Sequence, residues 1–290
     1  MAILFTLLTA LSACSQSDQP TLPSLQTTPT KTITSTATQT PIPSTETATP
    51  TQTPLACLAQ PGLVEENTLE STKPPQGFLI YLPPCYALQI DKRYPVLYLL
   101  HGQTYTADQW IRLGAVEVAN ELILSGESMP FIIVFPDDRY WNQPSGAGFG
   151  ERVTNDLVPY IDETYRTIPD PRFRAIGGMS RGAGWALQLG LTRPDLFSII
   201  GLHSLAVFQR DASKVAGWIQ DIPPASRPSI FIDIGEDDRE LTSTQMIETI
   251  FTQFDLPHEW HLYSGDHTEE YWSAHVEEYI RWYVGQWNQP

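Results

Sequence analysis

The sequence of 290 residues carries 17 Lys and Arg against 33 Asp and Glu, a formal net charge of −16 at pH 7. So acidic a chain excludes nucleic acid and anionic lipid head groups as expected partners, because both would be repelled. Its length fits one domain of catalytic size, since the first part of the chain has a composition unlike the rest.

The N-terminus, residues 1–14, reads MAILFTLLTALSAC. This apolar run is too short to span a bilayer and ends in small residues, which predicts a secretory signal peptide. The segment LSAC resembles the lipobox of bacterial lipoproteins, which implies a lipidated Cys14 at the mature N-terminus. An ordinary or uncleaved signal is the alternative, because the segment contains no Lys or Arg. We therefore expect an exported protein, at the cell surface or in the periplasm, that touches a bacterial membrane through a lipid anchor only.

The next segment, residues 15–56, consists almost wholly of Thr, Pro, Ser, Ala and Gln. Such a composition cannot bury enough apolar surface to fold. We expect a disordered, extended stalk that reaches on the order of 100 Å at roughly 3 Å per residue. The stalk carries only Asp18 and Glu46 against Lys31, so the acidic charge belongs to the domain expected at residues 57–290.

Two further cysteines, Cys57 and Cys85, lie early in that domain. In an exported protein, a pair of cysteines left over after lipidation predicts a disulfide. We expect it to tie the start of the domain to a nearby strand. Two free buried thiols are the alternative.

Short apolar runs alternate with longer helical patterns through this domain. The strand candidates are residues 77–82, 94–100, 131–135, 173–178, 197–202, 229–234 and 259–264, and the helix candidates are 107–125, 150–166, 181–191, 241–254 and 268–286. Several strand candidates are apolar throughout, as strands buried on both faces must be. The alternation predicts an α/β fold with a mostly parallel central sheet, helices on both faces, and functional residues at the carboxyl ends of strands.

The segment GMSRG at residues 178–182 fits the pattern G-x-S-x-G between a strand candidate and a helix candidate. On a tight strand-to-helix turn the serine hydroxyl stands above the sheet, and the residues two before and two after it have room only for very small side chains. Gly and Ser are common in loops, so a serine in an ordinary loop is the alternative. The strand and helix on either side favour Ser180 as a nucleophile.

A serine hydroxyl is a poor nucleophile at neutral pH and needs a base together with an acid that orients the base. In this architecture the partners follow in the order serine, acid, histidine, each after a later strand. The segment IDIGEDD supplies acids after one strand candidate, and YSGDH places His267 after the last. For the negative charge that develops on a carbonyl oxygen, we expect the backbone N–H groups of Gln103, in LLHGQ, and Arg181.

Together with YPVLYLLHGQ, FIIVFPDD, RPDLF and GDHTEEYW, these segments are similar to the esterase D and feruloyl esterase group of α/β-hydrolases, which includes S-formylglutathione hydrolases, enterochelin esterases and antigen 85 mycolyltransferases. The resemblance implies Ser180 as the nucleophile, His267 as the base and Asp238, at the family's Gly-x-x-Asp spacing, as the acid. Arg181 stands where the family commonly has methionine, and Ala183 where it often has a second glycine.

Chemistry alone does not choose the acid, because four acids lie close together in IDIGEDD. Asp233 lies inside the strand candidate and points to one face of the sheet. Glu236 and Asp237 fall in the turn, where we expect them to be solvated. Asp238 comes one step later, where the chain should return over the sheet edge toward His267.

Other polar and aromatic residues carry weaker expectations. His203 follows a strand candidate and is a minor candidate for contact with substrate, and we expect Trp110 and Trp272 to be packing residues. Asp137 and Asp138 in FPDD could suggest a metal, but no matching His or acid spacing accompanies them. We expect a solvated loop there, and an enzyme that needs neither metal nor other cofactor.

The expected function is a serine esterase, secreted or membrane-tethered, that cleaves carboxylic esters through an acyl-enzyme. Its substrates would be small-molecule or polysaccharide esters, feruloyl-type esters among them. Two alternatives remain open: an acyltransferase of the mycolyltransferase type, in which an alcohol replaces water, and a non-catalytic surface binding module on the same fold.

Overall fold

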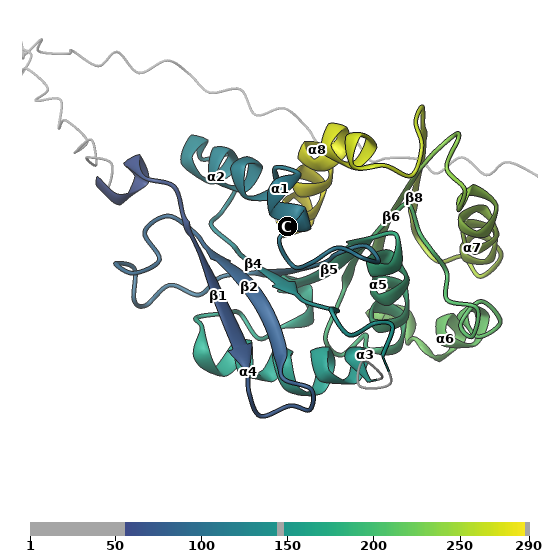
Figure 1. The fold of residues 1–290 in the computed structure, drawn as a ribbon, viewed down its shortest axis with the longest axis horizontal. Helices are drawn as coiled ribbons and strands as arrows, with labels where there is room; N and C mark the ends of the chain where they lie inside the picture. The colour runs from purple at the N-terminus through teal and green to yellow at the C-terminus, as the bar shows by residue number, and fades with distance from the viewer. Residues whose placement is uncertain (1–55, 144–147, 288–290) are drawn as a thin grey trace, which may run out of the picture. The chain divides into compact units, whose positions relative to one another are not determined.

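The computed structural model describes residues 56–143 and 148–287, which form a sheet covered by helices on both faces (Figure 1). The expected signal peptide, Cys14 and almost all of the expected stalk lie outside the described residues. Within those residues, no helix combines the length and apolar character that a membrane crossing needs.

The eight strands are arranged in the order β1-β2-β4-β3-β5-β6-β7-β8. β1 and β2 run antiparallel to their neighbours, while every pair from β4 to β8 is parallel. This topology confirms the predicted mostly parallel α/β fold. The strands are β1 (Leu63–Leu69), β2 (Gln76–Leu82), β3 (Val96–Leu100), β4 (Ile132–Pro136), β5 (Arg174–Met179), β6 (Ile199–His203), β7 (Ser229–Gly235) and β8 (Glu259–Tyr263).

Helices follow most of the parallel strands. They are α1 (Gln109–Arg112), α2 (Ala115–Ser125), α3 (Phe149–Glu151), α4 (Val158–Thr164), α5 (Arg181–Thr192), α6 (Val215–Asp221), α7 (Leu241–Gln253) and α8 (Glu269–Trp287), with a π-helical turn η3 (Arg152–Leu157) and the short 3-10 turns η1 (Ala56–Ala59), η4 (Pro171–Phe173) and η5 (Pro224–Ser226). The helix expected at 107–125 is divided in two, because Gly114 adopts a φ of 105° that ends one helix and starts the next.

Two apolar cores lie on the two faces of the sheet. β3 shows why its sequence is apolar throughout: Val96, Tyr98 and Leu100 enter one core, while Leu97 and Leu99 enter the other. Consecutive side chains of a strand point to opposite faces, so a strand covered on both sides has no position for a solvated residue. The expected strands β2 to β7 are largely buried for this reason, whereas the expected β8 lies at a sheet edge and has no buried residue.

Strand β1 and helix α6 were not expected from the sequence. β1 is one of the two edge strands, pairs only with β2, and keeps most of its residues exposed or half-buried. Its sequence, LVEENTL, therefore lacks a continuous apolar signal. The structure also joins Cys57 to Cys85 in a disulfide with a Cα–Cα distance of 5.1 Å, which links the start of the domain to the segment after β2.

Candidate active site

Ser180 occupies a strained turn between β5 and α5, with φ 53° and ψ −119°. Its N–H donates to the His203 carbonyl at 2.9 Å. A side chain on Gly178 would collide with the backbone of Gly182, and one on Gly182 would collide with the Leu100 carbonyl. Both glycines of the G-x-S-x-G pattern are therefore required by close backbone approach, and the turn presents the serine above the carboxyl end of β5.

His267 lies in the loop between β8 and α8 and contacts Ser180 directly. Its Nε2 is 2.8 Å from Ser180 Oγ, and its Nδ1 is 2.9 Å from both carboxylate oxygens of Asp238. The loops that carry the histidine and the aspartate are joined by backbone bonds, since Asp237 N–H donates to the Gly265 carbonyl at 2.9 Å. In the neutral tautomer with a proton on Nδ1, Nε2 can accept the serine proton.

The electrostatic setting of Asp238 keeps its carboxylate ionised. Burial would raise the pKa of Asp238, but hydrogen bonds from His267 and from the Glu240 N–H, at 2.8 Å, bring the pKa below its ordinary value. Trp272 stands edge-on to the His267 ring, with centroids 5.0 Å apart. The imidazole is thus held from one side by a charge and from another by an aromatic ring.

Of the four acids in IDIGEDD, the structure places only Asp238 against His267. Asp233 is fully buried within the sheet, and Glu236 and Asp237 are exposed in the turn. The role of Asp238 as the acid stays a prediction.

A cavity of about 350 Å³ opens above Ser180 and His267. Part of its rim is exposed to solvent, at Gln103, Thr104 and Arg239. The lining residues are Gly102, Gln103, Thr104, Tyr105, Ser180, Ala206, Arg239, Glu240, His267 and Trp272.

Gln103, one of the two expected oxyanion donors, lies in the loop after β3. His101 Nε2 accepts the N–H of Asp138 at 2.9 Å, which leaves the ring proton on Nδ1 to donate to the Gly102 carbonyl at 2.8 Å. Gly102 N–H donates to Gln109 Oε1 at 2.8 Å. The His101 bond fixes the carbonyl of the planar peptide between Gly102 and Gln103, whose N–H points opposite to that carbonyl, and the Gln109 bond fixes the preceding peptide.

Arg181 is the other expected donor. It is the first residue of α5, so its N–H has no acceptor within the helix and is available to a ligand. Sequence reasoning missed Gln109, which is fully buried and holds the Gly102 peptide. No local pattern marks this glutamine, because its role depends on a fold that turns α1 back over the β3 loop.

The expectation of a solvated loop at Asp137 and Asp138 is wrong. Both residues are only 5% exposed. Asp137 pairs with Arg139, and Asp138 accepts hydrogen bonds from Arg181 Nε at 2.9 Å and Trp185 Nε1 at 3.0 Å. Buried carboxylates need such partners, and those of Asp138 come from α5. Among the described residues, no group of three or more His, Cys, Asp or Glu side chains is placed to hold a metal.

The expectation of His203 as a minor candidate for contact with substrate is wrong as well. Its side chain is fully buried, with Nδ1 2.6 Å from Asp233 and Nε2 3.0 Å from the Tyr283 hydroxyl. Trp110 and Trp272 pack in the interior as expected, at 0% and 2% exposure, and Trp272 also lines the cavity.

A mostly parallel sheet with a serine on a strand-to-helix turn, followed by an aspartate and a histidine on later loops, defines an α/β-hydrolase. Residues 70–283 match the family described as "Putative esterase". The chain belongs to this esterase family.

Two relatives are much longer than this chain. An endo-1,4-beta-xylanase/feruloyl esterase of Xylanibacter ruminicola is 28% identical over 192 residues, which cover 62% of this chain and 25% of that protein. An esterase of Mycobacterium tuberculosis is 29% identical over 168 residues, covering 55% of this chain and 34% of that protein. The chain thus spans about a quarter to a third of these relatives.

Solved structures show the same fold over most of the domain. A ferulic acid esterase aligns with a TM-score of 0.69 and 25% identity, covering 78% of this chain and 98% of that one. A ferulic acid esterase from Anaeromyces mucronatus, in complex with ferulic acid, aligns with a TM-score of 0.67 and 21% identity, covering 79% and 93%.

Proposed function

We propose that this protein is a serine hydrolase of carboxylic esters. The observation that carries the proposal is the hydrogen-bonded chain from Ser180 Oγ through His267 to Asp238, at 2.8 and 2.9 Å, on the floor of an open cavity. Membership of the esterase family supports the same reaction class.

In the first half-reaction, Ser180 Oγ attacks the ester carbonyl while His267 Nε2 takes the hydroxyl proton. The resulting imidazolium is stabilised by the Asp238 carboxylate, whose lowered pKa keeps it charged. The tetrahedral oxyanion is met by the N–H groups of Gln103 and Arg181. The bond to the alcohol oxygen then breaks, and His267 returns the proton to the leaving alcohol.

In the second half-reaction, water attacks the acyl-serine carbonyl and gives its proton to His267. The bond from the acyl carbon to Ser180 Oγ breaks, and His267 reprotonates the serine as the carboxylic acid leaves. The exposed rim of the cavity supports access by water. Transfer to an alcohol uses the same residues with a different acceptor. A binding module without catalysis would not require the hydrogen-bonded arrangement of Ser180, His267 and Asp238.

The experiment that tests this proposal combines labelling with product analysis. A fluorophosphonate should label Ser180 in the wild type and leave Ser180→Ala unlabelled, and the wild type should hydrolyse members of a panel of feruloyl, acetyl-xylan, p-nitrophenyl and siderophore esters. Added alcohols or sugars should not capture most of the acyl group. Labelling without hydrolysis, but with transfer to an alcohol, would replace hydrolase by acyltransferase. Absence of both labelling and turnover would favour the binding module.

We further propose that the ester is carried by a carbohydrate and that its acyl group is of the feruloyl type. The names of the Xylanibacter relative and of the aligned ferulic acid esterase support this substrate class. Among the panel members, feruloyl esters of xylan fragments should then give the highest kcat/KM.

For location, we propose export followed by lipid anchoring at Cys14. The Cys57–Cys85 disulfide supports an oxidising compartment, since disulfides persist mainly outside the cytosol. When expressed with its own N-terminus, the protein should partition into detergent, and Cys14→Ser should move it to the aqueous phase. A soluble wild type with no lipid mass on its mature terminus would contradict the anchor.

A further inference from the structure

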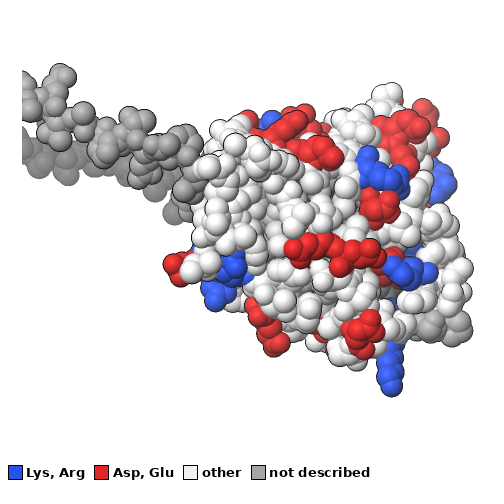
Figure 2. All heavy atoms as spheres, turned by 60° about the vertical axis from the view of Figure 1, so that its left-hand side comes forward, with Lys and Arg blue, Asp and Glu red and all other residues white. Residues whose placement is uncertain are grey.

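Asp138 is a buried carboxylate in a strongly acidic chain. The formal net charge is −16, and on the face drawn in Figure 2 the Asp and Glu side chains stand at the surface. Asp138, in the loop after β4, is buried instead, and this burial raises the pKa of its carboxyl group. Its Oδ1 meets no hydrogen-bond donor within residues 56–143 and 148–287. A carboxylate buried in this way is costly for stability, so packing alone does not account for it.

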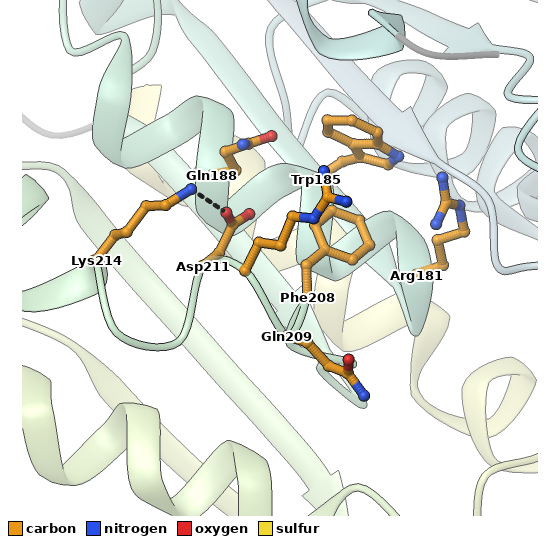
Figure 3. A pocket seen from close by; sticks show the side chains of 8 residues that line it. Arg181, Trp185, Gln188, Phe208, Gln209, Asp211 and Lys214 are labelled. Carbon is orange, nitrogen blue, oxygen red and sulfur yellow. Dashed lines mark hydrogen bonds and ion pairs between the residues drawn. The ribbon is translucent and has the colours of Figure 1, made fainter. Parts of the chain in front are cut away.

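The other carboxylate oxygen of Asp138 holds the first turn of α5. This Oδ2 accepts hydrogen bonds from Arg181 Nε at 2.9 Å and from Trp185 Nε1 at 3.0 Å. The two side chains are four residues apart and line the same hollow beside α5, as Figure 3 shows. Arg181 carries one of the proposed oxyanion N–H groups and directly follows Ser180, whose φ of 53° strains the turn. The carboxylate therefore restrains the turn that presents both the nucleophile and this donor.

The backbone of the same residue holds the loop after β3. Asp138 N–H donates to His101 Nε2 at 2.9 Å, and His101 Nδ1 donates to the Gly102 carbonyl at 2.8 Å. That carbonyl belongs to the peptide whose N–H is the proposed Gln103 donor. The His101 side chain is buried, so water does not compete for these two bonds. The direction of the Gln103 N–H therefore depends, through one histidine, on the position of Asp138.

Asp138 thus links the two proposed oxyanion donors, which come from different parts of the chain. Gln103 follows β3, and Arg181 follows β5. Two such N–H groups stabilise an oxyanion well only if they are held in place before the charge develops. A misplacement of about 1 Å can cost on the order of a hundredfold in rate. A residue bonded to the supports of both donors is placed to hold the spacing between them.

We propose that Asp138 is a positioning residue of the oxyanion hole. Its N–H orients the Gln103 peptide through His101, and its carboxylate fixes the Arg181 N–H through the first turn of α5. This inference rests on the proposed ester hydrolysis at Ser180. It assigns a role in the reaction to a carboxylate that touches neither the substrate nor the reacting atoms.

The test uses Asp138→Asn, which keeps the shape and the backbone N–H but removes the charge that holds Arg181. With p-nitrophenyl acetate, kcat per site that a fluorophosphonate labels should fall about a hundredfold, while KM stays within about twofold. A trifluoromethyl ketone probes the oxyanion hole itself, because Ser180 Oγ adds to its carbonyl carbon, His267 takes the hydroxyl proton, and the carbonyl oxygen becomes the oxyanion. The Ki of this ketone should rise by about the same factor as kcat/KM falls.

The double variant Asp138→Asn with Arg181→Met removes both charges of the pair, so it leaves no unpaired charge there even if the single variant folds poorly. It should show the same loss of kcat and the same rise in Ki, and Arg181→Met alone should already account for them to within about threefold, since both substitutions break one contact.

The matched control, Asp162→Asn, breaks the ion pair of the buried Arg174 at the opposite end of β5. It should lower the thermal midpoint and leave kcat per labelled site and Ki at their wild-type values. If Asp138→Asn and the double variant behave like this control, the inference is overturned while hydrolysis at Ser180 stands. If the wild type hydrolyses no ester and a fluorophosphonate does not label Ser180, the proposed function fails and this inference fails with it.

Discussion

His267 and His203 are each hydrogen-bonded to an aspartate carboxylate, but their surroundings differ. In the active-site pair, His267 lies 2.9 Å from Asp238 and its other ring nitrogen meets Ser180 beside a cavity. In the buried pair, His203 lies 2.6 Å from Asp233 and its other ring nitrogen meets the Tyr283 hydroxyl, with no exposure of the histidine or aspartate side chain. Contact between a histidine and an aspartate therefore does not by itself define a catalytic base. What matters is the group at the second ring nitrogen of the histidine and whether solvent can reach that group.

The buried pair has a different role, which is to fix helix α8. The Asp233 carboxylate also accepts hydrogen bonds from the hydroxyls of Tyr271 and Tyr279, at 2.8 and 2.7 Å. Both tyrosines belong to α8, as does Tyr283. Since α8 begins at Glu269, just after His267, the buried pair positions the loop that carries the proposed base.

The largest effect should come from removing the base of the active-site pair. His267→Ala should lower kcat for ester hydrolysis on the order of a millionfold, because members of such a triad act as one unit. Labelling of Ser180 by a fluorophosphonate should be lost with it. The thermal midpoint should stay close to the wild-type value. Turnover within tenfold of wild type would show that another group takes the serine proton.

The next effect should come from the acid of the same pair. Asp238→Asn should lower kcat about ten-thousandfold, because an amide favours the wrong imidazole tautomer, as it does in a protease triad. The neighbouring Asp237→Asn is the matched control and should cost little, since Asp237 is exposed. If the two variants exchanged these phenotypes, the acid would be the neighbouring residue.

A substitution in the buried pair should lower the stability of the domain more than its catalytic rate. Asp233→Asn leaves His203 and two tyrosine hydroxyls with a poorer acceptor, and the free energy of unfolding should fall by about 3–5 kcal/mol, as for other broken buried pairs. Urea unfolding measures this change, and kcat per folded molecule should fall far less than in Asp238→Asn. A loss of turnover as large as that of Asp238→Asn, with stability unchanged, would contradict the division of roles.

The smallest effect is a pH dependence of stability. Burial, followed by the charge of Asp233, raises the pKa of Tyr283 well above its ordinary value of 10.0. The folded state therefore keeps a proton that the unfolded state loses above pH 10, so this stability is present below pH 10 and declines as the pH rises further. Tyr283→Phe removes this titrating phenol. Above pH 10 the free energy of unfolding of the variant should therefore fall less steeply with pH, by about 1.4 kcal/mol per pH unit. Urea midpoints measured from pH 9 upward test it, and an unchanged slope would contradict the expected burial of the phenol.

Much of this arrangement could be predicted from the sequence where local pattern and structure coincide. The apolar runs marked every strand that is buried on both faces, and the glycines around Ser180 marked a turn whose backbone contacts exclude larger side chains. His267 could be predicted to lie near Ser180 because the loops that follow parallel strands meet at the carboxyl edge of the sheet. Edge strand β1 carries no such pattern, because one side of it faces solvent.

The failures concern residues whose partners come from distant elements. Asp138 was expected in a solvated loop, and only the folded chain brings Arg181 and Trp185 to it. Gln109 likewise acquires its role when α1 returns over the β3 loop. Composition and spacing do not contain these contacts, since they depend on how whole elements pack.

The disulfide has a mechanical consequence. Both β1 and β2 lie between Cys57 and Cys85 along the chain. A pulling force applied before Cys57 therefore passes through the covalent bridge to Cys85 and on toward β3, which is flanked by the parallel strands β4 and β5. The antiparallel β1–β2 pair, which would otherwise unzip one hydrogen-bonded step at a time, carries none of that load. A domain pulled from its N-terminus thus meets the force in the middle of its sheet, where several hydrogen bonds must shear together.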